Sequence, residues 1–269
     1  MRHDRRFRPM TTVFLTLCFV LAWGGVAAAG AADQNNAPAA PEQTRPAPDF
    51  LFGEPRGSIG VRASWVFARA GGDLFEFIRK QLTIDEGDFD APAFAVDVGL
   101  AVSPRADVLF GFEFSDAHTR SEYRDYVDSN RRPITQETGL REANLSGSVR
   151  IALMPRGRRV SRLAWIPRRA TPYAGAGGGI LWYRFQQQGD FIDVFNPRLT
   201  VFSDRLTSQG WTPSAHAFGG VDVRLSRRLF VAVEGRYLWA SASLERSFEG
   251  FDPIDLAGRR LTAGINVLF

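Results

Sequence analysis

The sequence contains very little cysteine, lysine or histidine. Its one cysteine is Cys18, its one lysine is Lys80, and its histidines are His3, His118 and His216. Without a cysteine beyond residue 18, the body of the chain offers no disulfide, thiol nucleophile or cysteine metal ligand. The shortage of histidine argues against general acid–base catalysis, which most often uses this side chain near neutral pH.

Long hydrophobic runs are also missing from most of the chain. Beyond residue 50, no apolar run reaches the roughly 18 residues that would indicate a membrane-spanning helix. At the N-terminus, basic residues precede the apolar stretch 13–23, and small residues at 27–31 offer a cleavage pattern. This arrangement predicts a secretory signal peptide over residues 1–29. The alternative, a membrane anchor, would need roughly 20 apolar residues, about twice the length of this run.

The basic character of the chain is concentrated in this signal. The formal net charge is +4, and residues 1–29 carry four arginines and one aspartate, which leaves the rest of the chain close to neutral. The high isoelectric point therefore gives no support for nucleic-acid binding. Residues 30–50 are rich in proline and alanine and predict an extended linker. The folded domain is expected over residues 51–269.

From residue 57 onward, apolar and polar residues alternate with the period of two that is typical of β-strands. Eight segments show the pattern: 58–67, 94–102, 108–114, 143–153, 172–185, 215–225, 229–239 and 261–269. Each is close to the ~9–11 residues of a tilted membrane-spanning strand, and an even number closes an antiparallel barrel without free edges. The sequence predicts an all-β fold, an eight-stranded antiparallel transmembrane β-barrel. A soluble β-sandwich is the alternative, because its strands alternate in the same way.

Two features favour the barrel. The polar faces hold mostly small residues, as a narrow lumen requires, and aromatic residues such as Trp65, Trp182 and Trp239 lie toward the strand ends, where membrane interfaces are expected.

The connections between the strands also alternate in length. Residues 104–105 and 226–228 are predicted to be tight turns, whereas 69–92, 115–140, 186–210 and 241–257 are predicted to be long polar loops. The basic segment 155–171 is an exception on the short-turn side, and is expected to be a solvated linker or a segment that contacts anionic lipid headgroups.

Three stretches make the chain resemble the small eight-stranded outer membrane β-barrel superfamily of Gram-negative bacteria, of the type of the outer membrane protein A membrane domain. They are the signal peptide, PYAGAGGG at 172–179 and AGRRLTAGINVLF at 257–269. The last stretch is similar to the C-terminal signal that barrel assembly machinery recognises. Its alternating residues are Leu261, Ala263, Ile265, Val267 and Phe269.

The resemblance implies localisation in the outer membrane after signal cleavage, with periplasmic termini and extracellular long loops. It also implies contact with outer membrane lipid and lipopolysaccharide, and assembly by periplasmic chaperones and the barrel assembly machinery. It does not imply one function, because members of the superfamily are anchors, adhesins, enzymes or narrow channels.

The residues that most often carry chemistry give little sign of a catalytic site. His216 is expected to fill the lumen, and His118 is expected in a solvated loop beside Asp116. The glycines of 172–179 lack the spacing of a phosphate-binding loop and are expected to relieve crowding. The acidic segment 83–90 offers oxygen ligands for Ca²⁺, but its spacing differs from an EF-hand and solvation is favoured. We therefore expect no enzyme activity, cofactor or metal.

The first long connection contains a short amphipathic pattern. Leu74, Phe75, Ile78 and Leu82 recur at helical spacing, and Asp73 is expected to be the N-cap. The pattern predicts a helix over residues 73–82. Such a helix would cap the barrel mouth, pack on the rim or lie on the outer leaflet.

Several charged residues fall on the polar faces, where unpaired charges would cost several kcal/mol each. We predict that six of them form a paired network that closes the lumen: Glu113, Arg150, Asp222, Arg224, Glu234 and Arg236. Asp222 and Arg224 are expected to face Glu234 and Arg236 across one hairpin. The favoured function is a non-enzymatic outer membrane barrel with a role in surface interaction or envelope integrity. The alternative is a narrow channel for small or hydrophobic solutes; no external ligand is indicated.

Overall fold

The computed structural model describes residues 50–128, 130–162, 164–193 and 200–269. The predicted signal peptide and nearly all of the predicted linker lie outside the described residues.

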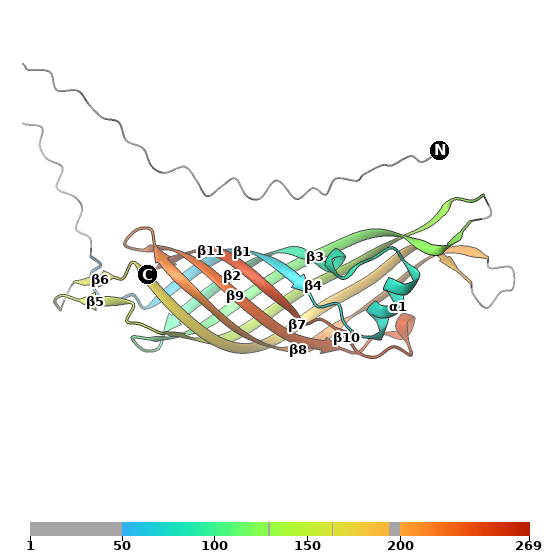
Figure 1. Cartoon of the computed structure of the whole chain (residues 1–269). Helices are drawn as coiled ribbons and strands as arrows, with labels where there is room; N and C mark the ends of the chain where they lie inside the picture. Colours follow the sequence, from blue (N-terminus) through green and yellow to red (C-terminus); the bar gives the residue numbers. More distant parts are fainter. Residues whose placement is uncertain (1–49, 129, 163, 194–199) are drawn as a thin grey trace, which may run out of the picture. The chain divides into compact units, whose positions relative to one another are not determined.

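Eight long strands form a closed antiparallel ring (Figure 1). Each strand pairs with the next of the eight, and the last pairs with the first, from Ser58 opposite Leu268 to Ala68 opposite Gly258. The ring therefore has no free edge, and the predicted eight-stranded barrel is confirmed. The strands are β1 (Gly57–Ala68), β2 (Ala91–Ala101), β3 (Ala106–Val127), β4 (Pro133–Ala152), β7 (Ala170–Ile192), β8 (Val201–Arg224), β9 (Leu229–Ala242) and β11 (Gly258–Leu268).

Shorter elements distinguish the two ends of the ring (Figure 1). The turn end carries the C-terminus, the tight β2–β3 and β8–β9 turns, and a small hairpin of β5 (Gly157–Arg159) and β6 (Trp165–Pro167). We call the opposite end the hairpin end, because the β3–β4 and β7–β8 hairpins project there. It also carries α1 (Asp73–Gln81), η1 (Glu86–Phe89), η2 (Arg246–Phe248) and β10 (Ile254–Asp255). No helix in the described ranges has both the length and the hydropathy needed to cross a bilayer.

The outer face of the barrel is apolar and the inner face is polar. Outward side chains that are 45–58% exposed include Ile59, Val61, Phe94, Phe110, Leu145, Val149, Ile180, Val233, Leu261 and Ile265. Their neighbours along the strands are buried polar groups, including Ser58, Arg62, Asp97, Glu113, Asn144, Arg150, Glu234 and Thr262. A soluble sandwich would bury the apolar face instead. The barrel is therefore built to stand in lipid, with its backbone groups paired around the ring.

Two of the predicted long loops are mostly strand, which corrects the expectation for 115–140 and 186–210. β3 and β4 stay paired from Ala106 opposite Ile151 to Val127 opposite Pro133, and β7 and β8 stay paired out to Ile192 opposite Val201. The pairing satisfies backbone groups that a loop would leave to water. His118 accordingly lies on the outer face of β3 and not in a loop.

The basic segment 155–171 is also different from the expectation of a linker. It contains the β5–β6 hairpin, and Trp165 at the start of β6 is buried. The Leu51 N–H donates to the Trp165 carbonyl at 2.8 Å, and the Trp165 N–H donates to the Leu51 carbonyl at 3.0 Å. The hairpin therefore holds the beginning of the described chain against the turn end.

Phe269 lies at the seam where β11 meets the start of β1. The N–H groups of Arg56 and Gly57 donate to its carbonyl, at 2.8 and 3.1 Å, and its own N–H donates to the Gly57 carbonyl at 3.0 Å. Its ring is 59% exposed, on the same outer face as Leu261, Ile265 and Val267. The structure thus places the predicted assembly residues on one lipid-facing stripe, and their role as a signal stays a prediction.

Deleting Phe269 should lower the amount of assembled barrel in outer membrane fractions, because the change removes three seam hydrogen bonds together with the predicted recognition residue. Heat-modifiable migration on gels measures the folded fraction. Phe110→Leu is the matched control, because Phe110 is equally exposed to lipid, at 57%, but lies away from the seam. Equal amounts of assembled barrel in the two variants would contradict the assigned role of the C-terminus.

Candidate functional site

The lumen contains buried ionic side chains in three groups. The central cluster is built around Glu234, which is 1% exposed. Its carboxylate contacts Arg62 Nη1 at 3.2 Å and Arg236 Nη2 at 2.9 Å, and the Tyr173 hydroxyl donates to it at 3.1 Å. Arg62 also contacts Asp97 at 2.7 Å. One buried arginine from β1 therefore joins two carboxylates from β2 and β9.

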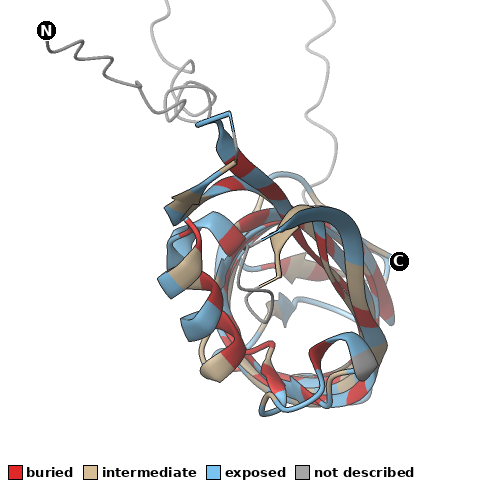
Figure 2. Ribbon diagram, turned by 90° about the vertical axis from the view of Figure 1, so that its right-hand side faces the viewer, coloured by how far each residue is buried: buried red, intermediate tan, exposed pale blue. Residues whose placement is uncertain are grey.

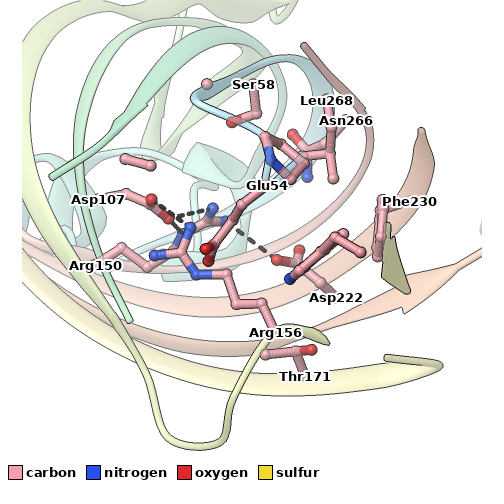
Figure 3. A pocket seen from close by; sticks show the side chains of 14 residues that line it. Glu54, Ser58, Asp107, Arg150, Arg156, Thr171, Asp222, Phe230, Asn266 and Leu268 are labelled. Carbon is pink, nitrogen blue, oxygen red and sulfur yellow. Dashed lines mark hydrogen bonds and ion pairs between the residues drawn. The ribbon is translucent and has the colours of Figure 1, made fainter. Parts of the chain in front are cut away.

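The turn-end cluster lies on the turn side of the central cluster, because Asp222 is two residues nearer the β8–β9 turn than Gly220, which is opposite Glu234. Figure 3 shows its side chains. Arg150 Nη2 contacts Asp107 Oδ2 at 2.7 Å, and Arg150 Nη1 contacts Asp222 Oδ2 at 3.2 Å. Arg156, which precedes β5, reaches the other oxygen of Asp107 at 2.6 Å. The cavity lined by these residues holds about 50 Å³, which is space for a few water molecules only.

The third group, the Arg260 cluster, lies on the other side of the central cluster. Arg260 is 3% exposed and contacts Glu113 at 2.6 Å and Glu142 at 2.9 Å. Arg62, Arg150 and Arg260 thus each contact two carboxylates. This pairing offsets the large desolvation penalty of burying the charges, and it fills an interior that eight strands make just wide enough for side chains.

Five of the six predicted network residues lie in these clusters. Glu234 with Arg236 and Arg150 with Asp222 are in contact, whereas Glu113 pairs with Arg260. Arg224 is half-buried near the end of β8. The predicted contact across the β8–β9 hairpin is wrong, because the register places Glu234 opposite Gly220 and Arg236 opposite Phe218.

Sequence reasoning missed partners that complete the clusters, namely Asp107, Glu142, Tyr173 and Arg260. Strand parity could have found two of them, because Asp107 shares β3 with Glu113 and Glu142 shares β4 with Arg150, each an even number of residues away. Arg260 directly precedes Leu261, which was assigned to the opposite face of the same strand.

An apolar core lies at the hairpin end of the barrel. Its members come from α1, η1, β7, β9 and the η2–β10 region, and include Leu74, Phe75, Ile78, Phe89, Leu181, Phe185, Leu238, Phe248, Ile254 and Leu256. The Phe75 ring is fully buried and lies 4.9 Å from Phe89 and 5.9 Å from Phe185, measured between ring centroids. Figure 2 shows α1 at the barrel mouth with its buried residues turned toward the barrel. The structure places α1 on the rim of the mouth, with its buried face packed on β7 residues such as Leu181 and Phe185.

The start of α1 differs from the expectation. Gly72 is the N-cap, with a φ of +94° that glycine adopts without strain, and Asp73 is the first helical residue. The Asp73 carboxylate accepts hydrogen bonds from the Leu74 N–H, at 2.8 Å, and the Asp252 N–H, at 3.0 Å. It therefore ties the start of the helix to the segment after η2.

Asp90 follows η1 at the hairpin end, and partial burial raises its pKa above the ordinary value of 3.8. Nearby Glu86 raises the pKa as well, whereas a hydrogen bond from the Ala68 N–H, at 3.0 Å, lowers it. Because the folded pKa is the higher one, the stabilising contribution of Asp90 is fully present below the unfolded pKa and is lost as pH rises through the folded pKa.

Asp90→Asn should remove this part of the pH dependence, because an amide oxygen still accepts from Ala68 but does not ionise. Urea unfolding in lipid, repeated from below pH 3.8 upward, measures the effect. We expect the variant to gain stability relative to the wild type as pH rises, by a small amount since Asp90 is only partly buried. The exposed Asp125→Asn serves as control, and a parallel response of the two variants would contradict the assignment.

The two described histidines have different environments. His216 is 2% exposed, and its Nε2 lies 2.7 Å from the Ser148 hydroxyl. The cavity beside Ser148 holds about 20 Å³, which leaves no room for an organic substrate. His118 is exposed and contacts Asp116 at 2.7 Å. Among the described residues, no three His, Asp or Glu side chains come together in a group that could hold a metal ion.

The glycines of 172–179 lie where the wall is crowded. A Cβ on Gly175 would collide with the Phe218 ring, and one on Gly177 would collide with the backbone of β4. In the acidic segment 83–90, Asp85 and Asp88 form a capping box in which each side chain hydrogen-bonds to the other's backbone, so these two carboxylates stabilise the start of η1.

No protein-family model matches the sequence, and no curated protein matches it. Solved structures give distant likenesses. Neisserial surface protein A is 11% identical, with 79% of this chain and 97% of that chain covered and a TM-score of 0.42. The N-terminal β-barrel domain of Pseudomonas aeruginosa OprF is 10% identical, with 80% and 100% covered and a TM-score of 0.33. Outer membrane protein W of E. coli is 15% identical, with 80% and 99% covered and a TM-score of 0.33.

The fold is assigned from the structure of the chain itself, which has a closed ring of strands, an apolar outer face and a charged interior. The fold is that of an eight-stranded outer-membrane-type β-barrel. Its candidate functional features are the ionic clusters of the lumen and the surface at the hairpin end.

Proposed function

We propose that the protein is a non-enzymatic, non-conducting barrel of the bacterial outer membrane that acts through its outside surface, in surface interaction or envelope integrity. The observation that carries the proposal is the closure of the lumen at several levels. The turn-end, central and Arg260 clusters fill the interior, and the apolar core beside α1 lies at its hairpin end.

This closure weighs against the channel alternative. A conducting pore needs a continuous path of water, and the cavities along the clusters hold about 20 and 50 Å³. The buried carboxylates are also paired with arginines, so they are not free to line an ion path.

The hairpin end supplies the surface for interaction. Beyond the apolar band, the β3–β4 and β7–β8 hairpins continue as paired strands that carry exposed apolar residues near their ends. Val127 is 59% exposed, and Phe202 is 46% exposed and stacks on Phe191 with 6.0 Å between ring centroids. Exposed apolar groups of this kind, held on paired strands, suit contact with another molecule.

The outer face also suits contact with anionic lipid. Arg141 and Arg184 lie just past the lipid-facing Trp182, and the Arg184 guanidinium lies 5.4 Å from the Trp182 ring. Basic groups beside interfacial aromatics are placed to meet the phosphates of lipopolysaccharide if the hairpin end faces outside. Insertion in this orientation would depend on periplasmic chaperones and the barrel assembly machinery.

Cysteine labelling in intact cells tests the proposed location and orientation. The chain has no cysteine after Cys18, so one introduced thiol is specific. Asn130→Cys, at the exposed tip of the β3–β4 hairpin, should react with a membrane-impermeant maleimide. Arg105→Cys, in the exposed β2–β3 turn, should react only after the outer membrane is permeabilised. Labelling of Arg105→Cys but not Asn130→Cys in intact cells would overturn the orientation. If neither variant is labelled in intact cells, the proposed surface exposure is wrong.

A further inference from the structure

A larger cavity lies at the hairpin end, apart from the ionic clusters. It holds about 300 Å³, a volume at the lower end of the range for small-molecule sites. Its walls come from α1, from the far parts of β3, β4, β7 and β8, and from η2 with the residues that follow it. Aromatic and aliphatic side chains such as Phe77, Tyr126, Phe191, Leu206 and Phe251 dominate these walls.

The polar groups of this cavity are all uncharged. The Gln136 amide nitrogen donates to the Tyr123 hydroxyl at 3.2 Å and to the Asp190 carbonyl at 3.0 Å, so its donors are in use. Gln187 also lines the cavity and is 6% exposed, and within the described residues its amide group has no hydrogen-bond partner. Solvent reaches the Gln187 amide atoms, which are not among the buried unsatisfied groups of the described residues, so the amide is available to hydrogen-bond to a ligand.

We propose that this cavity, the hairpin-end pocket, binds a neutral apolar molecule that carries one hydrogen-bonding group. Its apolar body packs among the aromatic walls, and its polar group bonds to the Gln187 amide. A charged ligand of the same shape binds much less well, because no charged residue among the described ones lines the pocket to compensate its desolvation. The pocket borders the apolar core and shares Leu74, Ile78 and Phe248 with it, and none of its lining residues belongs to the ionic clusters.

A pair of matched probes tests this proposal on the full mature chain in lipid nanodiscs. The probes are 2-naphthol, which is neutral at pH 7, and 2-naphthalenesulfonate, which has the same rings and a negative charge. Binding is followed by NMR of the isoleucine methyl groups. Ile78 and Ile192 line the pocket, whereas Ile59 and Ile265 lie on the lipid face and report partition into the bilayer.

We expect 2-naphthol to cause saturable shifts at Ile78 and Ile192, with affinity at least ten-fold above that of the sulfonate. Leu206→Trp should fill the pocket and abolish these shifts, and Gln187→Leu should weaken binding several-fold; heat-modifiable migration verifies folding of both. Non-saturable shifts that are equal at all four isoleucines would show partition only and overturn the proposal. Equal affinities for the two probes, or undiminished binding by folded Leu206→Trp and Gln187→Leu, would also overturn it. None of these outcomes bears on whether the lumen conducts.

Discussion

Arg62→Gln is expected to destabilise the barrel by about 3–5 kcal/mol, the usual range for breaking a buried ion pair. Arg62 is 4% exposed and contacts Asp97 at 2.7 Å and Glu234 at 3.2 Å. Its removal leaves one carboxylate without a cation and weakens the support of a second, inside a lumen with little room for water. Urea unfolding in lipid measures the loss.

Arg236→Gln should cost less than Arg62→Gln, although both arginines contact Glu234. Arg62 and the Tyr173 hydroxyl still hold the Glu234 carboxylate in that variant. Arg120→Gln is the control, because Arg120 is 89% exposed on its side chain and its 3.8 Å contact with Glu137 is a surface pair that contributes little. Equal losses for all three variants would show that the central cluster has no special role.

A double-mutant cycle isolates the coupling within the cluster. Glu234→Gln combined with Arg236→Gln should destabilise the barrel by less than the sum of the single variants, because the double variant removes a matched pair of charges. Strictly additive effects would contradict a paired network around Glu234.

Phe75→Ala is the second change expected to have a large effect, with a loss of about 3–5 kcal/mol. The Phe75 ring is fully buried between Phe89 and Phe185, and alanine would leave a cavity in the apolar core at the hairpin end. The same urea titration measures it.

Phe77→Ala is the matched control on the same helix, because Phe77 is 51% exposed. We expect it to cost far less than Phe75→Ala. If the two variants lose the same stability, α1 is not packed on the rim of the barrel mouth as the structure has it.

The alternation of residues was enough to predict the barrel and the face on which each side chain lies. In lipid the two faces of a strand meet very different surroundings, so residues such as Ile265 and Thr262 differ sharply in polarity. The same signal fails beyond the membrane band. Around Gln186, Gln187 and Gln188 both faces of the strand are polar, and the sequence there is indistinguishable from a loop.

The partners in the lumen could not be predicted from one hairpin at a time. Arg62 and Glu234 are 172 residues apart in the chain and meet because the ring closes between β1 and β11. The strand register also sets neighbouring pairs, and it places Glu234 opposite Gly220 and not opposite a charged residue of β8. Such pairings depend on closure and register, which alternation alone does not determine.

Conductance in planar lipid bilayers tests the closed lumen most directly. Purified wild-type protein whose folding is verified by heat-modifiable migration should insert without producing discrete current steps at any applied voltage. Reproducible single-channel currents from the folded wild-type barrel would contradict the closed lumen and support a narrow channel.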